Sequence, residues 1–354
     1  MRADSSALLS RIAAAFLALL VAGCASHTLV PYDAQRSSPP AAPSATEPIF
    51  PYQQQPISVH DQDLSNKETD SYNVRQLELD SIDENGQSND RLTGLYFQGK
   101  APGRTPLVIV LPIWGSYTYP PYAIAAGLRR RSEGGINVLR VGGESFVLEW
   151  EDMAEAPTKE VFLDEMAAGL TRVRANVVDV SRIIDWAEAQ PDIDPERIGL
   201  IGFSHGGITA GLVAVNETRL AATVIVMGGA HPDRIFATCP GRVGKLREII
   251  LERFDWTVEE YQTALAPVWK PYDAANYPGR ADPASILIID AAKDHCIPPD
   301  AREALWEVLG RPEHISLNYG HKKAFLSMTP LGFNWMRKQI YRFFDLKLSP
   351  AADD

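Results

Sequence analysis

Three features are scarce in this sequence, and each scarcity excludes a class of protein. The chain of 354 residues contains three cysteines, which excludes a scaffold held together by many disulfides. The formal net charge of -11 argues against nucleic acid as a partner and leaves no polybasic patch for a membrane surface. No internal repeat is visible, which excludes a repeat architecture. With 45% hydrophobic and 22% charged residues, the composition is that of a globular protein long enough for one large α/β domain or two small ones.

The N-terminus carries an apolar run over residues 12–22, preceded by Arg2 and Arg11. The run is too short for a comfortable membrane span and is followed at once by polar sequence, so it predicts an export signal. It ends in Leu-Val-Ala-Gly-Cys, which resembles the bacterial lipobox. The resemblance implies a lipoprotein signal peptide over residues 1–23 and lipidation of Cys24, whose acyl chains would anchor the protein to a membrane. The alternative is a plain secretory signal that leaves Cys24 as a free thiol.

Residue 25 bears on the location of such a lipoprotein. In the lipoproteins that this N-terminus resembles, Asp at this position favours retention at the inner membrane. The chain has Ala25, which implies an outer-membrane anchor facing the periplasm or the cell surface.

Residues 24–70 are rich in Pro, Ser and Ala and poor in aromatic residues. Nothing in this stretch is able to bury a core, so we predict a semi-extended linker that holds the following domain off the membrane. A Pro-rich recognition ligand is the alternative.

The body of the chain, residues 71–348, alternates apolar runs of strand length with amphipathic helical stretches. Several of the runs are continuously apolar, which is typical of strands buried on both faces of a parallel sheet. The pattern predicts an α/β fold with a mostly parallel, eight-stranded sheet and helices on both faces. The expected strands cover residues 72–79, 91–97, 106–111, 136–141, 197–203, 221–227, 286–289 and 315–319. The main expected helices cover residues 122–131, 158–189 and 333–346.

One interval breaks the alternation, between the sixth and seventh expected strands. Amphipathic helices fit residues 242–253 and 257–266 within it. Loops this long in compact domains usually carry structure or function. We therefore predict a small helical cap at about 229–284 that belongs to the same domain.

A Gly-x-Ser-x-Gly motif, Gly202 to Gly206, joins an apolar strand pattern to a helical one. At a sharp strand-to-helix turn a serine is held in strained backbone geometry with its hydroxyl exposed. The two glycines allow strand and helix to pass close together. The motif alone is short enough to occur by chance, but its strand-then-helix context predicts that Ser204 is a nucleophile.

A serine hydroxyl needs a base, and the base needs an acid to orient it. Asp294 follows the strand at 286–289, and His321 follows the strand at 315–319, so both emerge at strand ends. The order Ser204, Asp294, His321 is that of α/β-hydrolase triads. The alternatives for the acid are Asp290 and Asp233. The remaining histidines lie in the linker, directly after Ser204, in the cap, beside Asp294 or at the wrong end of a strand: His27, His60, His205, His231, His295 and His314.

Residues 70–348 resemble an α/β-hydrolase. The Asp-Pro-Glu-Arg-Ile-Gly run before the motif, and Gly320-His321 near the end, resemble the dienelactone-hydrolase and prolyl-oligopeptidase-like branch. The resemblance implies acyl transfer to Ser204 followed by hydrolysis. Dienelactone hydrolases have a cysteine where this chain has Ser204, so it points to a broader esterase or peptidase role.

The developing oxyanion requires two preorganised N–H donors. The resemblance implies the backbone of His205 as one donor. The other is expected from the loop after residues 106–111, where either Ile113 or Trp114 supplies it; that loop lacks the His-Gly-Gly-Gly of many esterases.

Four aromatic residues follow this loop: Trp114, Tyr117, Tyr119 and Tyr122. They predict either an apolar wall of the substrate site or packing beneath the cap.

Cys239 lies in the cap interval and Cys296 follows Asp294 closely. In an oxidising compartment they are able to form a disulfide that fixes the cap beside the acid, but the sequence does not fix the geometry, and the pairing stays open.

The sequence thus predicts a serine hydrolase acting on a small-molecule ester. A peptidase or amidase with the same triad, acting on a short peptide, is the second reading, and a non-catalytic binding lipoprotein is the third. No metal site is predicted and no cofactor is needed, because the His and Cys residues lack ligand spacing.

Overall fold

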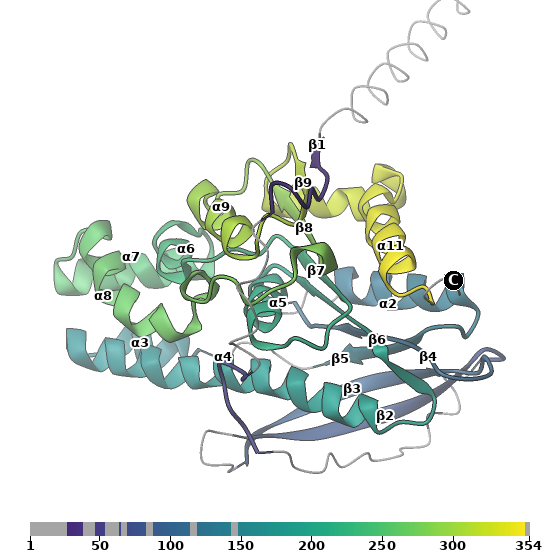
Figure 1. Cartoon of the computed structure of the whole chain (residues 1–354). Helices are drawn as coiled ribbons and strands as arrows, with labels where there is room; N and C mark the ends of the chain where they lie inside the picture. Colours follow the sequence, from purple (N-terminus) through teal and green to yellow (C-terminus); the bar gives the residue numbers. More distant parts are fainter. Residues whose placement is uncertain are drawn as a thin grey trace, which may run out of the picture.

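A nine-stranded sheet forms the centre of the computed structural model, which describes residues 27–37, 47–53, 64, 69–82, 88–113, 119–142 and 148–350. The strand order is β1-β9-β8-β7-β6-β4-β5-β3-β2 (Figure 1). Among the described residues, no helix is both long and apolar enough to span a membrane.

The central strands β5, β4, β6, β7, β8 and β9 are parallel to one another, as predicted. Several are buried along their whole length, which explains their continuous apolar sequence. Parallel strands end at the same edge of a sheet, so the loops after β6, β8 and β9 come together there. The bounds are β4 Thr105–Val110, β5 Asn137–Val141, β6 Ile193–Phe203, β7 Ala222–Val226, β8 Ile286–Ala291 and β9 Glu313–Leu317.

The strand count of eight was one too low, because β1 (His27–Val30) lies within the predicted linker and pairs antiparallel with β9. At the other edge, the hairpin of β2 (Tyr72–Ile82) and β3 (Ser88–Gly99) is antiparallel and adjoins β5. The sequence does not predict β1, because three of its four residues are exposed and the strand therefore has no apolar pattern.

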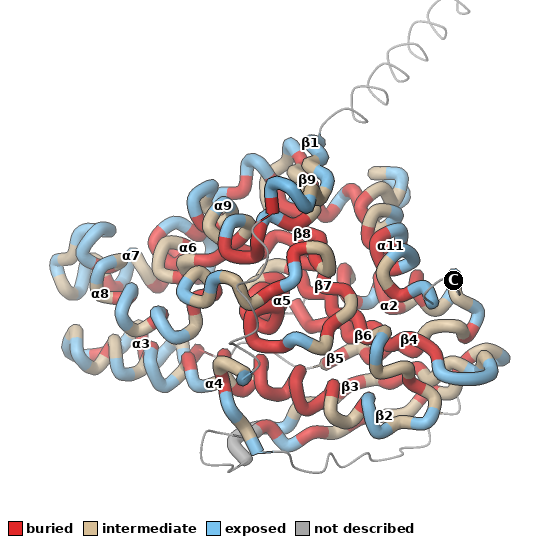
Figure 2. The backbone as a smooth tube through the Cα atoms, in the orientation of Figure 1, coloured by how far each residue is buried: buried red, intermediate tan, exposed pale blue. Residues whose placement is uncertain are grey.

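Helices cover both faces of the sheet, and each face has its own hydrophobic core. One face packs against α2 (Tyr119–Ser132) and α11 (Trp335–Lys347). The other packs against α4 (Lys159–Glu188), α5 (His205–Asn216) and α9 (Pro299–Val308). Figure 2 shows the strands and the inner faces of these helices as the buried part of the molecule.

The cap predicted between the sixth and seventh strands is present between β7 and β8. Its helices pack against one another and against α4 (Figure 1). The short helix α3 (Trp150–Glu155), which the sequence did not suggest, contacts both α4 and α7. The cap elements are α6 Pro232–Thr238, α7 Arg242–Phe254, α8 Val258–Trp269, η3 Lys270–Tyr272, η4 Ala274–Asn276 and η5 Pro283–Ser285.

The chain between β1 and β2 joins opposite edges of the sheet, which are about 38 Å apart at the usual spacing of strands. Residues 47–53 dock on the α4 and α5 face along this path. Phe50 is buried there: its N–H donates to Asn216 Oδ1 at 2.9 Å, and its ring stacks on Tyr272 with centroids 6.0 Å apart. Two pieces of the predicted linker, β1 and residues 47–53, are therefore part of the folded body.

Replacing Phe50 with Ala should lower the free energy of unfolding by about 3 kcal/mol, because the substitution empties a packed site. Urea denaturation followed by fluorescence measures the change. The control is Leu331→Ala, at a side chain with 85% exposure, which should change stability by no more than about 0.5 kcal/mol. Equal stability of Phe50→Ala and the wild type would contradict the docking of this segment.

Candidate active site

Ser204 sits at a sharp turn between β6 and α5. Its backbone angles are φ 53° and ψ -115°, a strained region for a residue with a side chain. Its N–H donates to the carbonyl of Val226 on the neighbouring strand at 2.8 Å, and its carbonyl accepts from Ile208 at 2.9 Å, which starts the helix. These bonds hold the strained turn in place, as the motif predicted.

The glycines of the motif are required by close backbone contacts. A Cβ at Gly202 would lie 1.8 Å from the carbonyl oxygen of Gly206. A Cβ at Gly206 would lie 2.4 Å from the carbonyl oxygen of Pro112, in the loop after β4. Atoms cannot approach so closely, so no larger residue fits either position.

Three side chains from separate loops form one chain of hydrogen bonds. Ser204 Oγ lies 2.9 Å from His321 Nε2, and His321 Nδ1 lies 2.6 Å from Asp294 Oδ2. The other carboxylate oxygen, Asp294 Oδ1, accepts the backbone N–H groups of Cys296 at 2.7 Å and Ile297 at 3.1 Å. The structure thus brings together the three residues that the sequence placed at strand ends.

The partners define the protonation pattern of this chain. A carboxylate only accepts, so Nδ1 of His321 carries the hydrogen and donates to Asp294. Nε2 of the neutral imidazole is then the acceptor that faces the Ser204 hydroxyl. The carboxyl group of Asp294 is buried, and His321 is only partly exposed. Such an arrangement is able to remove the hydroxyl proton and to stabilise the resulting imidazolium.

Asp290, the first alternative for the acid, belongs to a different His–Asp pair. β8 extends through Ala291, so Asp290 lies within the strand and not beyond it. Its carboxylate contacts His314 Nε2 at 2.8 Å and accepts from the Ser316 hydroxyl. Burial raises the pKa of Asp290, but His314, Ser316 and Arg302 outweigh this effect and hold that pKa below its usual value.

Asp233, the second alternative, accepts a hydrogen bond from Gln262 at 3.0 Å within the cap. It lies close to His231 and Asp273, the one group of possible metal-ligating side chains found among the described residues. Asp273 Oδ2 lies 2.9 Å from His231 Nδ1, and its Oδ1 accepts the backbone N–H groups of His231 and Ala275. These bonds give the cluster a structural role, because they fix the start of α6 and of η4.

Of the other histidines, His295 is exposed, and His27 packs on Trp335 at the edge of the sheet. His60 lies outside the described residues. The ring of His205 lines the pocket beside Ser204, and burial lowers the pKa of His205 to about 4, so the ring is neutral at neutral pH.

The structure describes two of the three residues whose backbone N–H groups are predicted to bind the oxyanion, His205 and Ile113. His205 is the first residue of α5, where backbone N–H groups point out of the helix end. Ile113 is buried in the loop after β4, directly after Pro112, which touches Gly206. Trp114, the other predicted donor, lies outside the described residues, as does Cys24.

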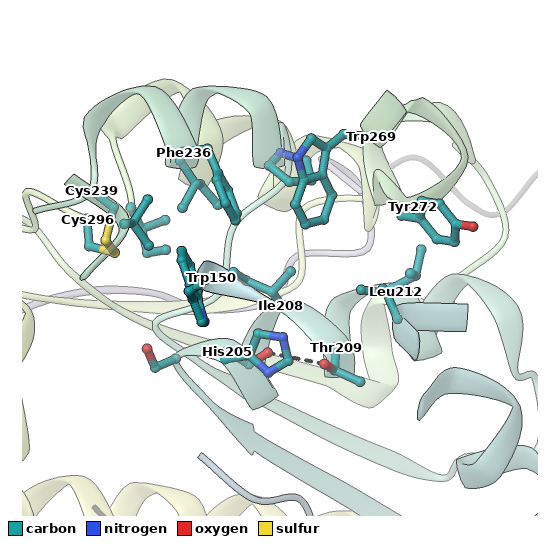
Figure 3. Close-up of a pocket in the computed structure, with 16 residues that line it drawn as sticks. Trp150, His205, Ile208, Thr209, Leu212, Phe236, Cys239, Trp269, Tyr272 and Cys296 are labelled. Atoms are coloured by element: carbon teal, nitrogen blue, oxygen red, sulfur yellow. Dashed lines mark hydrogen bonds between the residues drawn. A yellow bond between two sulfur atoms is a disulfide. The ribbon is translucent and has the colours of Figure 1, made fainter. Parts of the chain in front are cut away.

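A pocket with a cavity volume of about 70 Å³ opens beside Ser204 and extends beneath the cap (Figure 3). One wall is the first two turns of α5, and the other consists of cap residues and Trp150 from α3, with Val173 of α4 and Cys296 and Ile297 of the loop after β8 completing the lining. The residues that line it are Trp150, Val173, Ser204, His205, Ile208, Thr209, Leu212, Pro232, Ile235, Phe236, Cys239, Val243, Trp269, Tyr272, Cys296 and Ile297.

Of the two interpretations of the aromatic residues after β4, the substrate wall does not hold for the described members. Tyr122 is 57% exposed, Tyr119 packs against the hydrophobic core on the α2 and α11 face, and neither lines the pocket. Trp114 and Tyr117 lie outside the described residues. The observed aromatic side chains come instead from Trp150, Phe236, Trp269 and Tyr272. The concentration of aromatic residues at the end of α8 was the one sequence signal for this wall.

The structure contains the disulfide between Cys239 and Cys296, which the sequence left open. Cys239 follows α6 in the cap, and Cys296 donates its backbone N–H to Asp294. The bond therefore ties the cap wall of the pocket to the loop that holds the carboxylate.

Comparisons with known proteins agree with this architecture. A family model described as X-Pro dipeptidyl-peptidase (S15 family) matches residues 167–282, and no curated protein matches the chain. An acetyl xylan esterase from Paenibacillus sp. R4 superposes with a TM-score of 0.59 at 19% identity, covering 83% of this chain and 90% of that one. Acetyl xylan esterase 1 from Thermoanaerobacterium sp. JW/SL YS485 gives a TM-score of 0.57 at 16% identity, covering 87% and 99%.

An acylaminoacyl peptidase from Pyrococcus horikoshii gives a TM-score of 0.50 at 17% identity. The match covers 82% of this chain but only 44% of the peptidase. These likenesses confirm the α/β-hydrolase fold predicted from the sequence.

Removing the disulfide should destabilise the protein. Cys239 and Cys296 are 57 residues apart, and a cross-link closing a loop of that size is worth about 4 kcal/mol when chain entropy dominates. The double variant Cys239→Ser/Cys296→Ser should lose up to that amount in urea denaturation. Wild type treated with a reductant should behave like the double variant. Mass spectrometry without reductant that finds two free thiols in air-oxidised protein would contradict the bond.

Proposed function

From the α/β-hydrolase fold and the geometry around Ser204, we propose that this chain is a serine hydrolase that cleaves a carboxylic ester. The observation that carries the proposal is the continuous hydrogen-bond chain from Ser204 through His321 to Asp294, at 2.9 Å and 2.6 Å. Three residues from distant loops meet in the order and geometry that nucleophilic catalysis requires.

The reaction proceeds in two steps. Ser204 Oγ attacks the carbonyl carbon while His321 Nε2 takes the hydroxyl proton, and the N–H of His205 with that of Ile113 or Trp114 stabilises the oxyanion. The bond to the alcohol oxygen breaks, and His321 returns the proton to that oxygen. Water then attacks the acyl-enzyme and loses a proton to His321, the bond to Ser204 Oγ breaks, His321 returns the proton to that oxygen, and the carboxylic acid leaves. Asp294 holds the imidazole in the correct tautomer and stabilises its charged form throughout.

A peptidase or amidase with the same residues is the second candidate, and the family match over residues 167–282 favours it. A peptide terminus or a charged side chain needs an opposite charge to bind. Within the part of the chain that the structure describes, the residues that line the pocket include no Asp, Glu, Lys or Arg. The apolar pocket therefore supports an ester substrate over a short peptide.

A non-catalytic binding lipoprotein is the third candidate. The hydrogen bonds from Ser204 through His321 to Asp294 argue against it, because binding alone does not require a hydroxyl aligned with a base and an orienting acid.

The test is covalent labelling by a fluorophosphonate probe together with hydrolysis of p-nitrophenyl butyrate. Wild type should be labelled and active. Ser204→Ala should lose the label, and its kcat should fall by about 10⁴-fold or more. An unlabelled, inactive but folded wild type would overturn the proposal.

A matched pair of carboxylate variants tests the assignment of the acid. Asp294→Asn should lower kcat by about 10⁴-fold, because the amide no longer holds the correct imidazole tautomer. Asp290→Asn alters the neighbouring His–Asp pair, so its kcat per folded enzyme should stay within about threefold of wild type. A larger loss for Asp290→Asn than for Asp294→Asn would reverse the assignment.

We also propose that the protein is an exported bacterial lipoprotein anchored through Cys24, with the outer membrane as its place because residue 25 is Ala. Only residues 25 and 26 separate Cys24 from β1, a distance of at most about 10 Å from Cys24 to His27. A lipid on Cys24 would therefore hold the edge of the sheet at β1 and β9 close to the membrane.

Expression in a bacterial host with an alkyne-bearing fatty acid checks the anchor. Wild type should incorporate the label and sediment with membranes, and Cys24→Ala should do neither. Leu331→Ala serves as the control, because it changes an exposed side chain and leaves residues 1–24 as they are. Wild type that is exported without incorporating fatty acid would support a plain secretory signal instead.

A further inference from the structure

The pocket beside Ser204 follows the axis of α5. Residues 204, 205, 208, 209 and 212 all line it, and this spacing places them on one face of the helix. From Ser204 to Leu212 the helix advances about 12 Å. Figure 3 shows Ile208 and Leu212 on one side of the pocket and Phe236 and Trp269 on the opposite side.

The opposite wall is built from aromatic rings that support one another. Trp150 stacks on Phe236 with centroids 6.4 Å apart, and Phe236 contacts Trp269 at 5.0 Å. Tyr272 is held from behind by the ring of Phe50. Since these rings come from α3, α6, α8 and η3 and are packed together, the shape of the wall is set before a substrate arrives.

The lining offers little to a polar group. Among the described residues it contains no Asp, Glu, Lys or Arg, and the Thr209 hydroxyl donates to the carbonyl of His205 at 3.2 Å. A charged group in this space would lose its hydration without meeting an opposite charge from these residues, which is costly. An apolar chain would gain from burial.

The position of His321 decides which half of an ester enters the pocket. His321 returns the proton to the leaving oxygen, so the alcohol half must lie on the His321 side of Ser204. The pocket is lined by Ser204 and His205, but His321 is not among its residues. The alcohol half therefore lies outside the pocket, and the acyl half points into it.

We propose that this pocket binds the acyl chain and makes the enzyme selective for esters of apolar carboxylic acids longer than acetic acid. The inference rests on the proposed serine hydrolase function. The lining extends about 12 Å along α5 from Ser204, so an acyl chain longer than acetyl meets apolar side chains along it. Leu212 and Tyr272 lie together at one end of the pocket (Figure 3), and we expect them to limit the length of the chain.

The first experiment measures kcat/KM for p-nitrophenyl acetate, butyrate, hexanoate and octanoate. Burial of each methylene is worth up to about fourfold, so hexanoate should exceed acetate by at least about tenfold. Equal values, or a preference for acetate, would overturn the proposal.

A pair of isomers tests the assignment of the acyl half. Ethyl octanoate and octyl acetate have the same composition, but the long chain lies on the acyl half in one and on the alcohol half in the other. Ethyl octanoate should be hydrolysed at least about tenfold faster in kcat/KM, because only its long chain enters the pocket. The reverse order would show that the pocket holds the alcohol.

Two variants shorten the pocket to different depths. Leu212→Phe fills the far end and should lower kcat/KM for octanoate by at least about tenfold, with acetate within about twofold. Ile208→Phe lies one turn closer to Ser204, so it should lower kcat/KM by a similar factor already for hexanoate and butyrate. Ile249→Phe, at a side chain with 41% exposure on α7 outside the pocket, should change neither.

Labelling of Ser204 by a small fluorophosphonate distinguishes a failure of the acyl-pocket inference from a failure of the proposed hydrolase function. Variants that label at the wild-type rate are folded and have an intact triad, so a chain-length profile that does not change in them overturns the acyl pocket alone. If the wild type itself neither labels nor hydrolyses any of the esters, the proposed function fails and this inference fails with it.

Discussion

At the end of β6 three backbone segments approach one another more closely than side chains permit. Gly202 lies against the carbonyl of Gly206, and Gly206 lies against the carbonyl of Pro112. This contact forces the chain to reverse over Ser204, starts α5 at His205, and places the loop after β4 beside the helix end. The position of Ser204, the proposed N–H donors and the pocket wall along α5 all depend on it. A single methyl group added at Gly202 or Gly206 would push these backbone segments apart and so displace all of these parts at once.

The rest of the site is held by contacts between residues far apart in the chain. The disulfide and the N–H groups of Cys296 and Ile297 fix Asp294, and the same disulfide fixes the cap. Phe50, from the segment between β1 and β2, supports Tyr272 at the far end of the pocket. The pocket is therefore formed by tertiary packing around the turn at Ser204, which is itself fixed by local contacts. We expect substitutions in the pocket wall to change substrate selectivity while this turn stays the same.

The sequence predicted the features that leave a local pattern and missed those that do not. Buried parallel strands are continuously apolar, so the sheet and the strand ends were found. The strand end at β8 was placed two residues too early, and for that reason Asp290 competed with Asp294 although it pairs with His314 inside the strand. β1 has no apolar signature because it is an edge strand with three of its four residues exposed. The ring of Trp150 joins the pocket only through packing with Phe236, which no periodicity reports.

The strand β1 gives part of the predicted linker, residues 24–70, a structural role. A free tether would let the domain move away from its anchor, whereas a chain that pairs with β9 at residues 27–30 and docks again at residues 47–53 crosses the sheet as a strap. The strap then reaches the opposite edge at β2, so it spans about 38 Å and contributes the ring that supports Tyr272. If Cys24 carries a lipid, the membrane constrains the edge strand directly, and the same strap connects that edge to Tyr272 in the proposed acyl pocket. Under these two proposals, anchoring and substrate binding would involve one continuous stretch of chain.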